Sequence, residues 1–175
     1  MDKPKLSNKI RVVSNRRKRE NCPEKQLQFY TDYASAVSDT LKKPLFQKFL
    51  RWIMKREKIE RIAVTDIQVR VFPFKKENGK TLAGRCNTDD GVILIFPKKR
   101  SFFRKKLQNH KKEKIRFYLK NRAMAALIHE ILHIKYDDNE SKVKYLTRKY
   151  FGIFIRHQTP DVHKAHAIQK MLFTF

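Results

Sequence analysis

Residues 124–134 read MAALIHEILHI, and much of what the sequence predicts about fold and chemistry follows from this short stretch. Drawn as a helix, it is apolar on nearly every side, which is typical of a helix buried inside a domain. Three ionisable residues, His129, Glu130 and His133, interrupt the apolar run. Burying such side chains is costly unless they have partners, so the stretch predicts that the three residues act together.

The spacing of these residues, H-E-x-x-H, predicts a catalytic metal site. Residues four apart on a helix stack on one face about 6 Å apart, so the imidazoles of His129 and His133 can converge on one ion. Zinc accepts neutral imidazole nitrogen in a tetrahedral arrangement, and a catalytic site keeps one position for water. Glu130 is turned by about 100° from His129, so its carboxylate can reach that water as general base and then protonate a leaving amine. The rival interpretation is two buried histidines bonded to backbone carbonyls beside an incidental glutamate.

A third metal ligand is expected in the acidic segment that follows the motif. Asn139 is a plausible N-cap for the next helix, and Glu140 then lies in its first turn, from which it can swing back to the metal. Acidic residues are also common in first turns because they complement the helix dipole. Because of its position in that first turn, Glu140 is nevertheless the preferred third ligand, and Asp137, Asp138 and His157 remain alternatives.

The hydrophobic pattern around the motif predicts an α+β fold. In chain order it indicates a helix over 44–54, strands over 67–71, 82–87 and 92–96 with a turn at 77–80, helices over 114–136 and from 140 towards 154, and a short helix after Pro160. The strand 92–96 is apolar throughout, so it is expected to be buried on both faces. These elements predict a small antiparallel or mixed sheet of about three strands, packed on helices that include the motif helix.

Part of this pattern resembles a known family. The segment 82–86 (LAGRC), the apolar strand 92–96 and the segment 126–133 (ALIHEILH) together resemble the core of the SprT-like (Spartan-like) zinc metalloproteases. In that family a Gly-x-Cys-like strand and an apolar strand precede the HExxH helix. The similarity extends over residues 44–155, and HExxH is its specific motif.

The resemblance implies a zincin-like minimal metalloprotease fold and a set of roles. His129 and His133 would bind one catalytic Zn²⁺, Glu130 would be the catalytic base, and Glu140, which opens the next helix, would be the third ligand. The family typically has histidine at that third position, and its cysteine-rich zinc ribbon is missing here. Some family members act on proteins attached to DNA.

The composition predicts attraction to polyanions. The 175 residues contain 42 Lys and Arg against 17 Asp and Glu, a formal charge of +25. Residues 1–28 are rich in cations and poor in large apolar side chains, so a flexible basic tail is expected there, with the metalloprotease domain over 29–175.

Several classes of protein are excluded or disfavoured by the same composition. With 41% hydrophobic residues the chain is too apolar to be wholly disordered. No apolar run approaches the roughly 20 residues of a membrane span. The beginning of the chain lacks the apolar segment of a secretion signal, so an intracellular protein is expected. Cys22 and Cys86 lie far apart, which excludes a disulfide scaffold and a cysteine-based zinc finger.

A basic segment, residues 98–122, holds twelve Lys or Arg and one acid, so it predicts binding of DNA or RNA beside the motif. The candidate nucleic-acid-binding residues are Lys98, Lys99, Arg100, Arg104, Lys105, Lys106, Lys111 and Lys112. Phe102, Phe103, Phe117 and Tyr118 are interleaved with them and can stack on bases, but a place in the core is favoured for these aromatic residues. The cations can instead attract acidic substrates directly.

Together these observations predict a zinc-dependent endopeptidase that acts on, or is regulated by, nucleic-acid-bound proteins. The alternative is a non-catalytic nucleic-acid-binding protein in which the zinc site is structural or silent.

Overall fold

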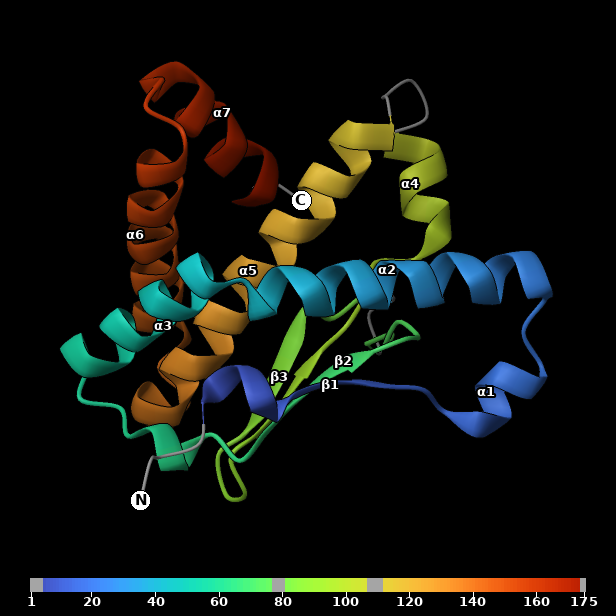
Figure 1. Cartoon of the computed structure of the whole chain (residues 1–175), viewed down its shortest axis with the longest axis horizontal. Coiled ribbons are helices and arrows are strands. Elements are labelled where there is room, and N and C mark those ends of the chain that lie inside the picture. Colours follow the sequence, from blue (N-terminus) through green and yellow to red (C-terminus); the bar gives the residue numbers. More distant parts are fainter. Residues whose placement is uncertain (1–4, 77–80, 107–111, 174–175) are drawn as a thin grey trace.

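The computed structural model describes residues 5–76, 81–106 and 112–173, which form a mixed α+β structure (Figure 1). The helices are α1 (Arg16–Glu20), α2 (Glu24–Lys42), α3 (Pro44–Arg56), α4 (Arg100–Lys106), α5 (Lys112–Tyr136), α6 (Glu140–Gln158) and α7 (Val162–Phe173). The strands are β1 (Ile10–Val13), β2 (Asp66–Arg70), β3 (Gly84–Asn87) and β4 (Val92–Ile95). Short 3-10 helices occur at Leu6–Lys9 and Arg61–Ala63. The turn predicted at 77–80 lies outside the described residues.

The four strands form one mixed sheet in the order β1-β2-β4-β3. Strands β1, β2 and β4 are parallel, and β3 pairs antiparallel with β4, with Gly84 opposite Ile95. The predicted mixed sheet is confirmed, with one strand more than expected. Strand β3 lies at the edge of the sheet, where its outer side has no neighbouring strand among the described residues.

The additional strand, β1, comes from the segment predicted to be a flexible tail. Ile10 lies opposite Ile67 in the parallel register, and Leu6 and Ile10 are 2% and 4% exposed. The predicted tail over residues 1–28 is therefore wrong for the segment 6–13, and helix α2 runs across the predicted boundary at residue 29. Local patterning hid this strand because its few apolar residues stand among cations and its sheet partner lies far along the chain.

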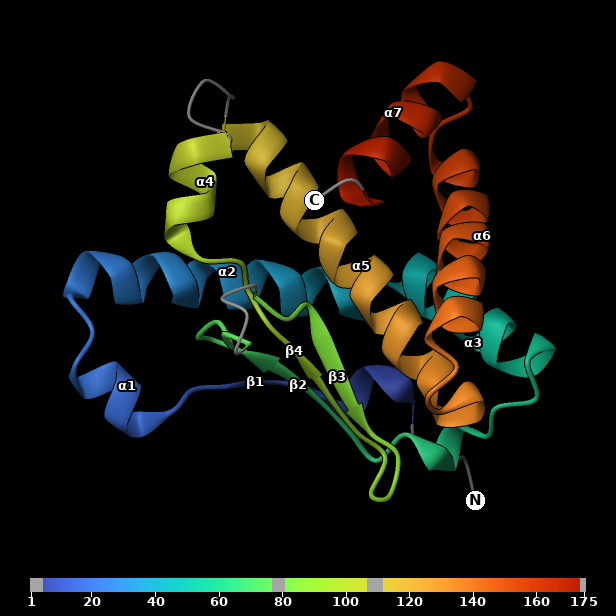
Figure 2. The same ribbon diagram turned by 180° about the vertical axis from the view of Figure 1, so that it is seen from behind.

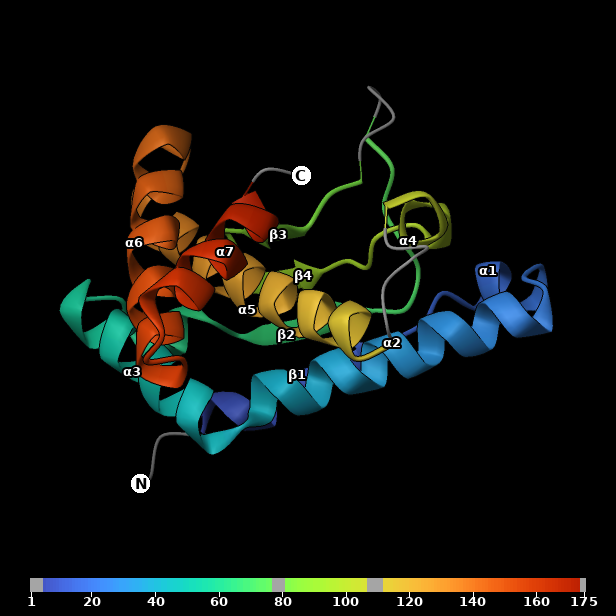
Figure 3. The same ribbon diagram turned by 90° about the horizontal axis from the view of Figure 1, so that it is seen from above.

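The helices cover one face of the sheet. Helix α2 contacts β1 and β2, and helix α5 contacts β3 and β4 (Figure 3). In β4, Ile93 and Ile95 are buried while Val92 and Leu94 remain partly exposed. The prediction that this strand is buried on both faces is therefore wrong, because its second face lacks a covering layer in the described part of the chain.

Helix α5 is the central element, and it runs through the molecule beside β3 and β4 (Figure 2). Residues 121–132 of this helix are buried except for the partly exposed His129, as the sequence predicts, with Leu127, Ile128 and Ile131 at 0% exposure. Arg122 is buried in the same helix and donates hydrogen bonds to the carbonyl oxygens of Phe96 (2.7 Å) and Leu82 (3.3 Å). These bonds fix α5 against the ends of the two strands beside it, so this cation of the basic segment has a structural role.

Helices α2, α3, α6 and α7 contact α5. Helix α3 confirms the predicted helix at Pro44, while α6 and α7 are longer than predicted and α4 was not expected. Helices α6 and α7 lie at one end of the molecule, and α1 and α4 lie at the opposite end (Figure 1). None of the described helices combines the length and the apolar character that a membrane span requires.

Candidate metal centre

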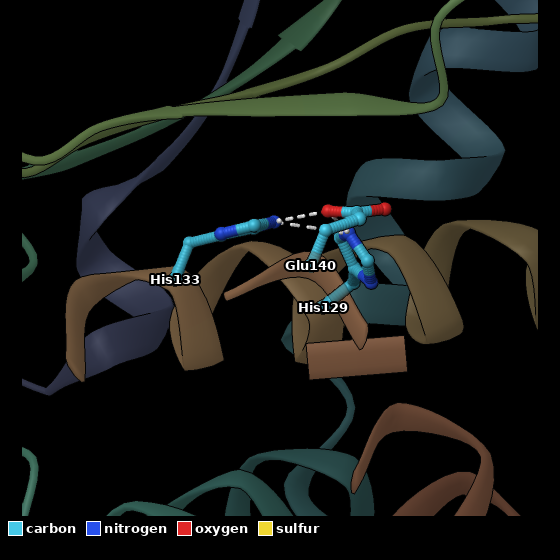
Figure 4. A group of neighbouring side chains, drawn as sticks. All are labelled: His129, His133 and Glu140. Carbon is cyan, nitrogen blue, oxygen red and sulfur yellow. Dashed lines mark hydrogen bonds and ion pairs between the residues drawn. The ribbon is translucent and has the colours of Figure 1, made fainter. Parts of the chain in front are cut away.

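Three predicted ligands meet at one point between α5 and α6 (Figure 4). The Nε2 atoms of His129 and His133 are 3.1 Å apart, and Glu140 Oε2 lies 3.6 Å and 3.2 Å from them. Ligand atoms bound tetrahedrally at zinc–nitrogen and zinc–oxygen distances lie about 3.3 Å apart. The triangle therefore has the dimensions of three corners of a tetrahedral site and could hold a metal ion.

The other candidates for the third ligand lie outside this triangle. Among the described residues, the His, Cys, Asp and Glu side chains close enough to share an ion are those of His129, His133 and Glu140. Asp137 and Asp138 line the surrounding cleft, and His157 is exposed in the last turn of α6. The structure thus favours Glu140 over these three alternatives.

The turn between α5 and α6 brings Glu140 back over the motif. Asp137 follows α5 and lies in the left-handed region with φ of 43°, and the side chain of Asn139 caps α6 by accepting from the backbone N–H of Lys142 (3.1 Å). Glu140 is the first residue of α6, and its Oε1 is 3.0 Å from Lys144 Nζ. This contact occupies one carboxylate oxygen and leaves Oε2 facing the two imidazoles.

Hydrogen bonds on the far side of each ring assign the histidine tautomers. His133 Nδ1 lies 2.5 Å from the carbonyl oxygen of Asp137, which can only accept. His129 Nδ1 lies 3.2 Å from Thr147 Oγ1, whose own hydrogen is donated to the carbonyl of Val143 (2.7 Å). Both Nδ1 atoms must therefore be donors, and in a neutral imidazole this leaves a lone pair on Nε2.

The protonation states of His129 and Glu140 favour a cation bound between them. Burial lowers the pKa of His129 to about 4, against the opposing effect of Glu140, so this ring is neutral at physiological pH. Burial acts to raise the pKa of Glu140, but the hydrogen bond from Lys144 and neighbouring charges outweigh it and lower the pKa. The unprotonated Nε2 of His129 and the ionised Oε2 of Glu140 thus face each other at 3.6 Å, and they repel unless a cation lies between them. This donor set fits a divalent metal of the zinc type.

Glu130 lies beside the triangle and is held by strand β3. It is 6% exposed, and the backbone N–H of Cys86 donates a hydrogen bond to its carboxylate. Burial raises the pKa of Glu130 to about 8, and the bond from Cys86 opposes this shift. A Cβ atom on Gly84 would lie 2.6 Å from Glu130 Oε1, so only glycine leaves room for the carboxylate at this point of the strand.

A large cleft opens onto these residues. Its volume is about 1070 Å³, and its lining includes residues 81–88 around strand β3, His129, His133 and Glu140, and also Leu172 and Phe173 at the end of α7. Because β3 is an edge strand, the cleft offers an extended molecule a backbone to pair with along one wall.

The predicted nucleic-acid-binding residues are spread over several environments. Lys98 lines the cleft, with its Nζ 4.7 Å from the centroid of the Phe102 ring. Arg100 opens α4 and its guanidinium lies over the Phe29 ring, whereas Lys105 is exposed on α4. Lys99 is half-buried just before α4, Arg104 and Lys106 belong to α4, Lys112 begins α5, and Lys111 lies outside the described residues.

The aromatic residues of the basic segment divide between core and surface. Phe103 and Tyr118 are buried, at 5% and 2% exposure, which confirms the favoured core interpretation for these two. Phe102 is partly buried and stacks on Tyr118, with ring centroids 5.7 Å apart. Phe117 is 40% exposed, so it is the one of the four that can offer much of a ring face to a base.

Several contributors to the site were not predicted from the sequence. Gly84 appears in the sequence analysis only within the segment that resembles a known family, and the sequence does not predict the roles of Thr147 and the Cys86 backbone. Thr147 stands seven residues after Glu140, two turns along the same face of α6, and that spacing is the available sequence signal. The contacts of Gly84 and Cys86 with Glu130 depend on packing between strand and helix, which local patterns do not encode.

The role of Thr147 leads to a prediction about metal affinity. Thr147→Val should weaken binding of Zn²⁺ about 10- to 100-fold, because valine has the shape of threonine but cannot accept the proton on His129 Nδ1. Competition with a chelator of known affinity measures the change, and Thr147→Ser, which keeps the hydroxyl, is the control. Equal affinities for wild type and Thr147→Val would contradict the assigned role.

Comparisons with known proteins give no match: no protein-family model, no curated protein and no solved structure is similar to this chain.

Proposed function

We propose that this protein is a zinc-dependent endopeptidase with a zincin-like site of the SprT-like kind. The observation that supports this most strongly is the convergence of the Nε2 atoms of His129 and His133 on Glu140 Oε2, with Glu130 lining the same cleft. The HExxH helix packs against a mixed sheet whose antiparallel edge strand borders the same cleft, so an extended peptide could lie beside the proposed metal site.

Zinc bound by His129, His133 and Glu140 would supply Lewis acidity, which polarises a peptide carbonyl and acidifies water. The chain's own groups move the protons. Glu130 takes one from the water that attacks the carbonyl carbon, and it then transfers the proton to the amine nitrogen that leaves. Burial raises the pKa of Glu130, so its side chain can hold the proton that it takes from water until the amine leaves.

The proposed substrate is a peptide segment in extended conformation. It would pair along the outer side of β3 by main-chain hydrogen bonds, which places its backbone across the cleft that holds Glu130. Several cationic side chains line the cleft, among them Lys98, Arg85 and Lys144, and they favour acidic side chains on the substrate.

Nucleic acid is the proposed partner of the surface outside the cleft. The formal charge of +25 and the exposed cations, such as Lys105, favour binding of DNA or RNA through phosphates. Such binding would concentrate the peptidase near other nucleic-acid-bound proteins, which are then its preferred substrates.

Zinc dependence tests the proposed function. The purified chain should bind one Zn²⁺, and cleavage of casein should appear when zinc is added to the metal-free protein and disappear with a chelator. Assays are run with and without single-stranded and double-stranded DNA and RNA, so that a requirement for nucleic acid is detected. A zinc-loaded protein that binds nucleic acid but cleaves nothing under any of these conditions would instead support the non-catalytic alternative.

A further inference from the structure

A buried carboxylate outside the metal centre joins the three helices around it. Glu57 is the C-cap residue that follows α3, is 7% exposed, and accepts hydrogen bonds from two phenols. Tyr136 Oη donates to Glu57 Oε2 at 2.6 Å, and Tyr150 Oη donates to Glu57 Oε1 in a short contact. Lys135 Nζ donates to the backbone carbonyl of Glu57 at 2.6 Å and lies 3.5 Å from Oε2.

These contacts keep the Glu57 carboxylate ionised and give each of its two oxygen atoms a hydrogen-bond donor. Burial acts to raise its pKa, but the hydrogen bonds from Tyr136 and Tyr150 and the charge of Lys135 outweigh burial and lower the pKa below its usual value. Burying a charged group costs desolvation free energy, and apolar residues of similar size often stabilise a core equally well. Glu57 takes no part in the proposed proton transfers that would explain this cost. Its contacts therefore point to a role beyond packing.

Each phenol stands next to a group that orients one histidine of the metal centre. Tyr136 is the last residue of α5 and precedes Asp137, whose carbonyl accepts from His133 Nδ1. Tyr150 lies three residues after Thr147 on the same helix, and Thr147 Oγ1 accepts from His129 Nδ1. One carboxylate thus holds both helix segments that carry these outer partners.

We propose that Glu57 is a positioning residue for the metal centre, which orients His133 through Tyr136 and His129 through Tyr150. This inference rests on the metal site of the proposed function, but not on peptidase activity. The Glu57 carboxylate fixes the last turn of α5 against α6, so the Asp137 carbonyl and the Thr147 hydroxyl stay at hydrogen-bond distance from the two rings. Loss of such outer partners typically weakens metal binding by about 10- to 100-fold.

Metal binding by four proteins tests this role: wild type, Glu57→Gln, Tyr136→Phe and the control Tyr30→Phe. Tyr30 is a matched control because it is 3% exposed and its hydroxyl accepts a hydrogen bond from the backbone N–H of Arg100 (3.0 Å), in contact with α4 rather than with the metal centre. Zn²⁺ affinity is measured by chelator competition, and the absorption spectrum of the Co²⁺-loaded protein reports ligand geometry.

We expect the Zn²⁺ dissociation constant to rise about 10- to 100-fold in Glu57→Gln and about 10-fold in Tyr136→Phe, with an altered Co²⁺ spectrum, while Tyr30→Phe matches wild type in both. Tyr136→Phe decides the question if Glu57→Gln does not fold. Wild-type affinity and spectrum in Tyr136→Phe, or an equal loss in Tyr30→Phe, would overturn the proposal. A wild-type protein that binds no metal would overturn the metal site itself, which separates the two failures.

Discussion

Replacing Glu130 by glutamine is expected to reduce the rate of peptide cleavage by about 10²- to 10⁴-fold while leaving zinc binding intact. The amide has the size of the carboxylate, and its oxygen can still accept the hydrogen bond from the Cys86 backbone N–H. It cannot take a proton from water, so the step assigned to Glu130 is lost. Because Glu130 is 6% exposed, a neutral side chain at this position should not reduce the stability of the fold.

The measurement pairs cleavage of casein with zinc content of the same samples. Glu113→Gln is a matched control, since it makes the same change at an exposed position near the start of the same helix, and it should cleave like wild type. If Glu130→Gln cleaves at the wild-type rate, Glu130 is not the base. If neither protein cleaves any substrate although both bind zinc, the chain is better described as a binding protein.

The parts of this site that the sequence predicts are those determined by spacing along one or two helices. His129 and His133 are one helical turn apart, and Glu140 opens the helix that follows the short turn after them. Helical periodicity and the N-cap residue Asn139 are therefore enough to predict that the three side chains meet. The mixed α+β class follows equally from changes of hydrophobic period. Strand β1 could not be predicted in this way, because its place in the sheet depends on pairing with a distant segment.

The parts that the sequence does not predict come from contacts between distant segments. Glu57 meets Tyr136 and Tyr150 across about half the length of the chain, and nothing in its own helix indicates a buried partner. Likewise, Arg122 reads as one cation among twelve in the basic segment, yet it is buried against backbone carbonyls. The number of Lys and Arg residues in a sequence therefore overestimates the cationic surface that can bind polyanions wherever one of these residues is buried in the core.

Gly84→Ala is expected to lower cleavage by about 10²-fold or more, although it changes a residue on the strand opposite the motif helix. The added Cβ would lie 2.6 Å from Glu130 Oε1 and 2.7 Å from its Cγ, closer than nonbonded atoms can approach. Gly84 does not have a positive φ, so alanine introduces no backbone strain, and the flexible Glu130 side chain can rotate away. The chain should therefore fold and bind zinc, but the carboxylate would leave the Cys86 N–H and the position from which we propose that it acts as a base.

Gly152→Ala provides the matched control for this prediction. Its Cβ would meet Gln169 Nε2, the end of a flexible side chain on α7 that has no assigned role in the proton transfers, so cleavage should stay near the wild-type rate. Zinc content and thermal unfolding of both variants separate a displaced base from a damaged fold. Wild-type cleavage by Gly84→Ala would show that Glu130 does not act from its place against β3. A loss of zinc in that variant would show that strand β3 supports the metal ligands rather than the base. The combination expected here, zinc retained and cleavage lost, is one that misfolding cannot produce.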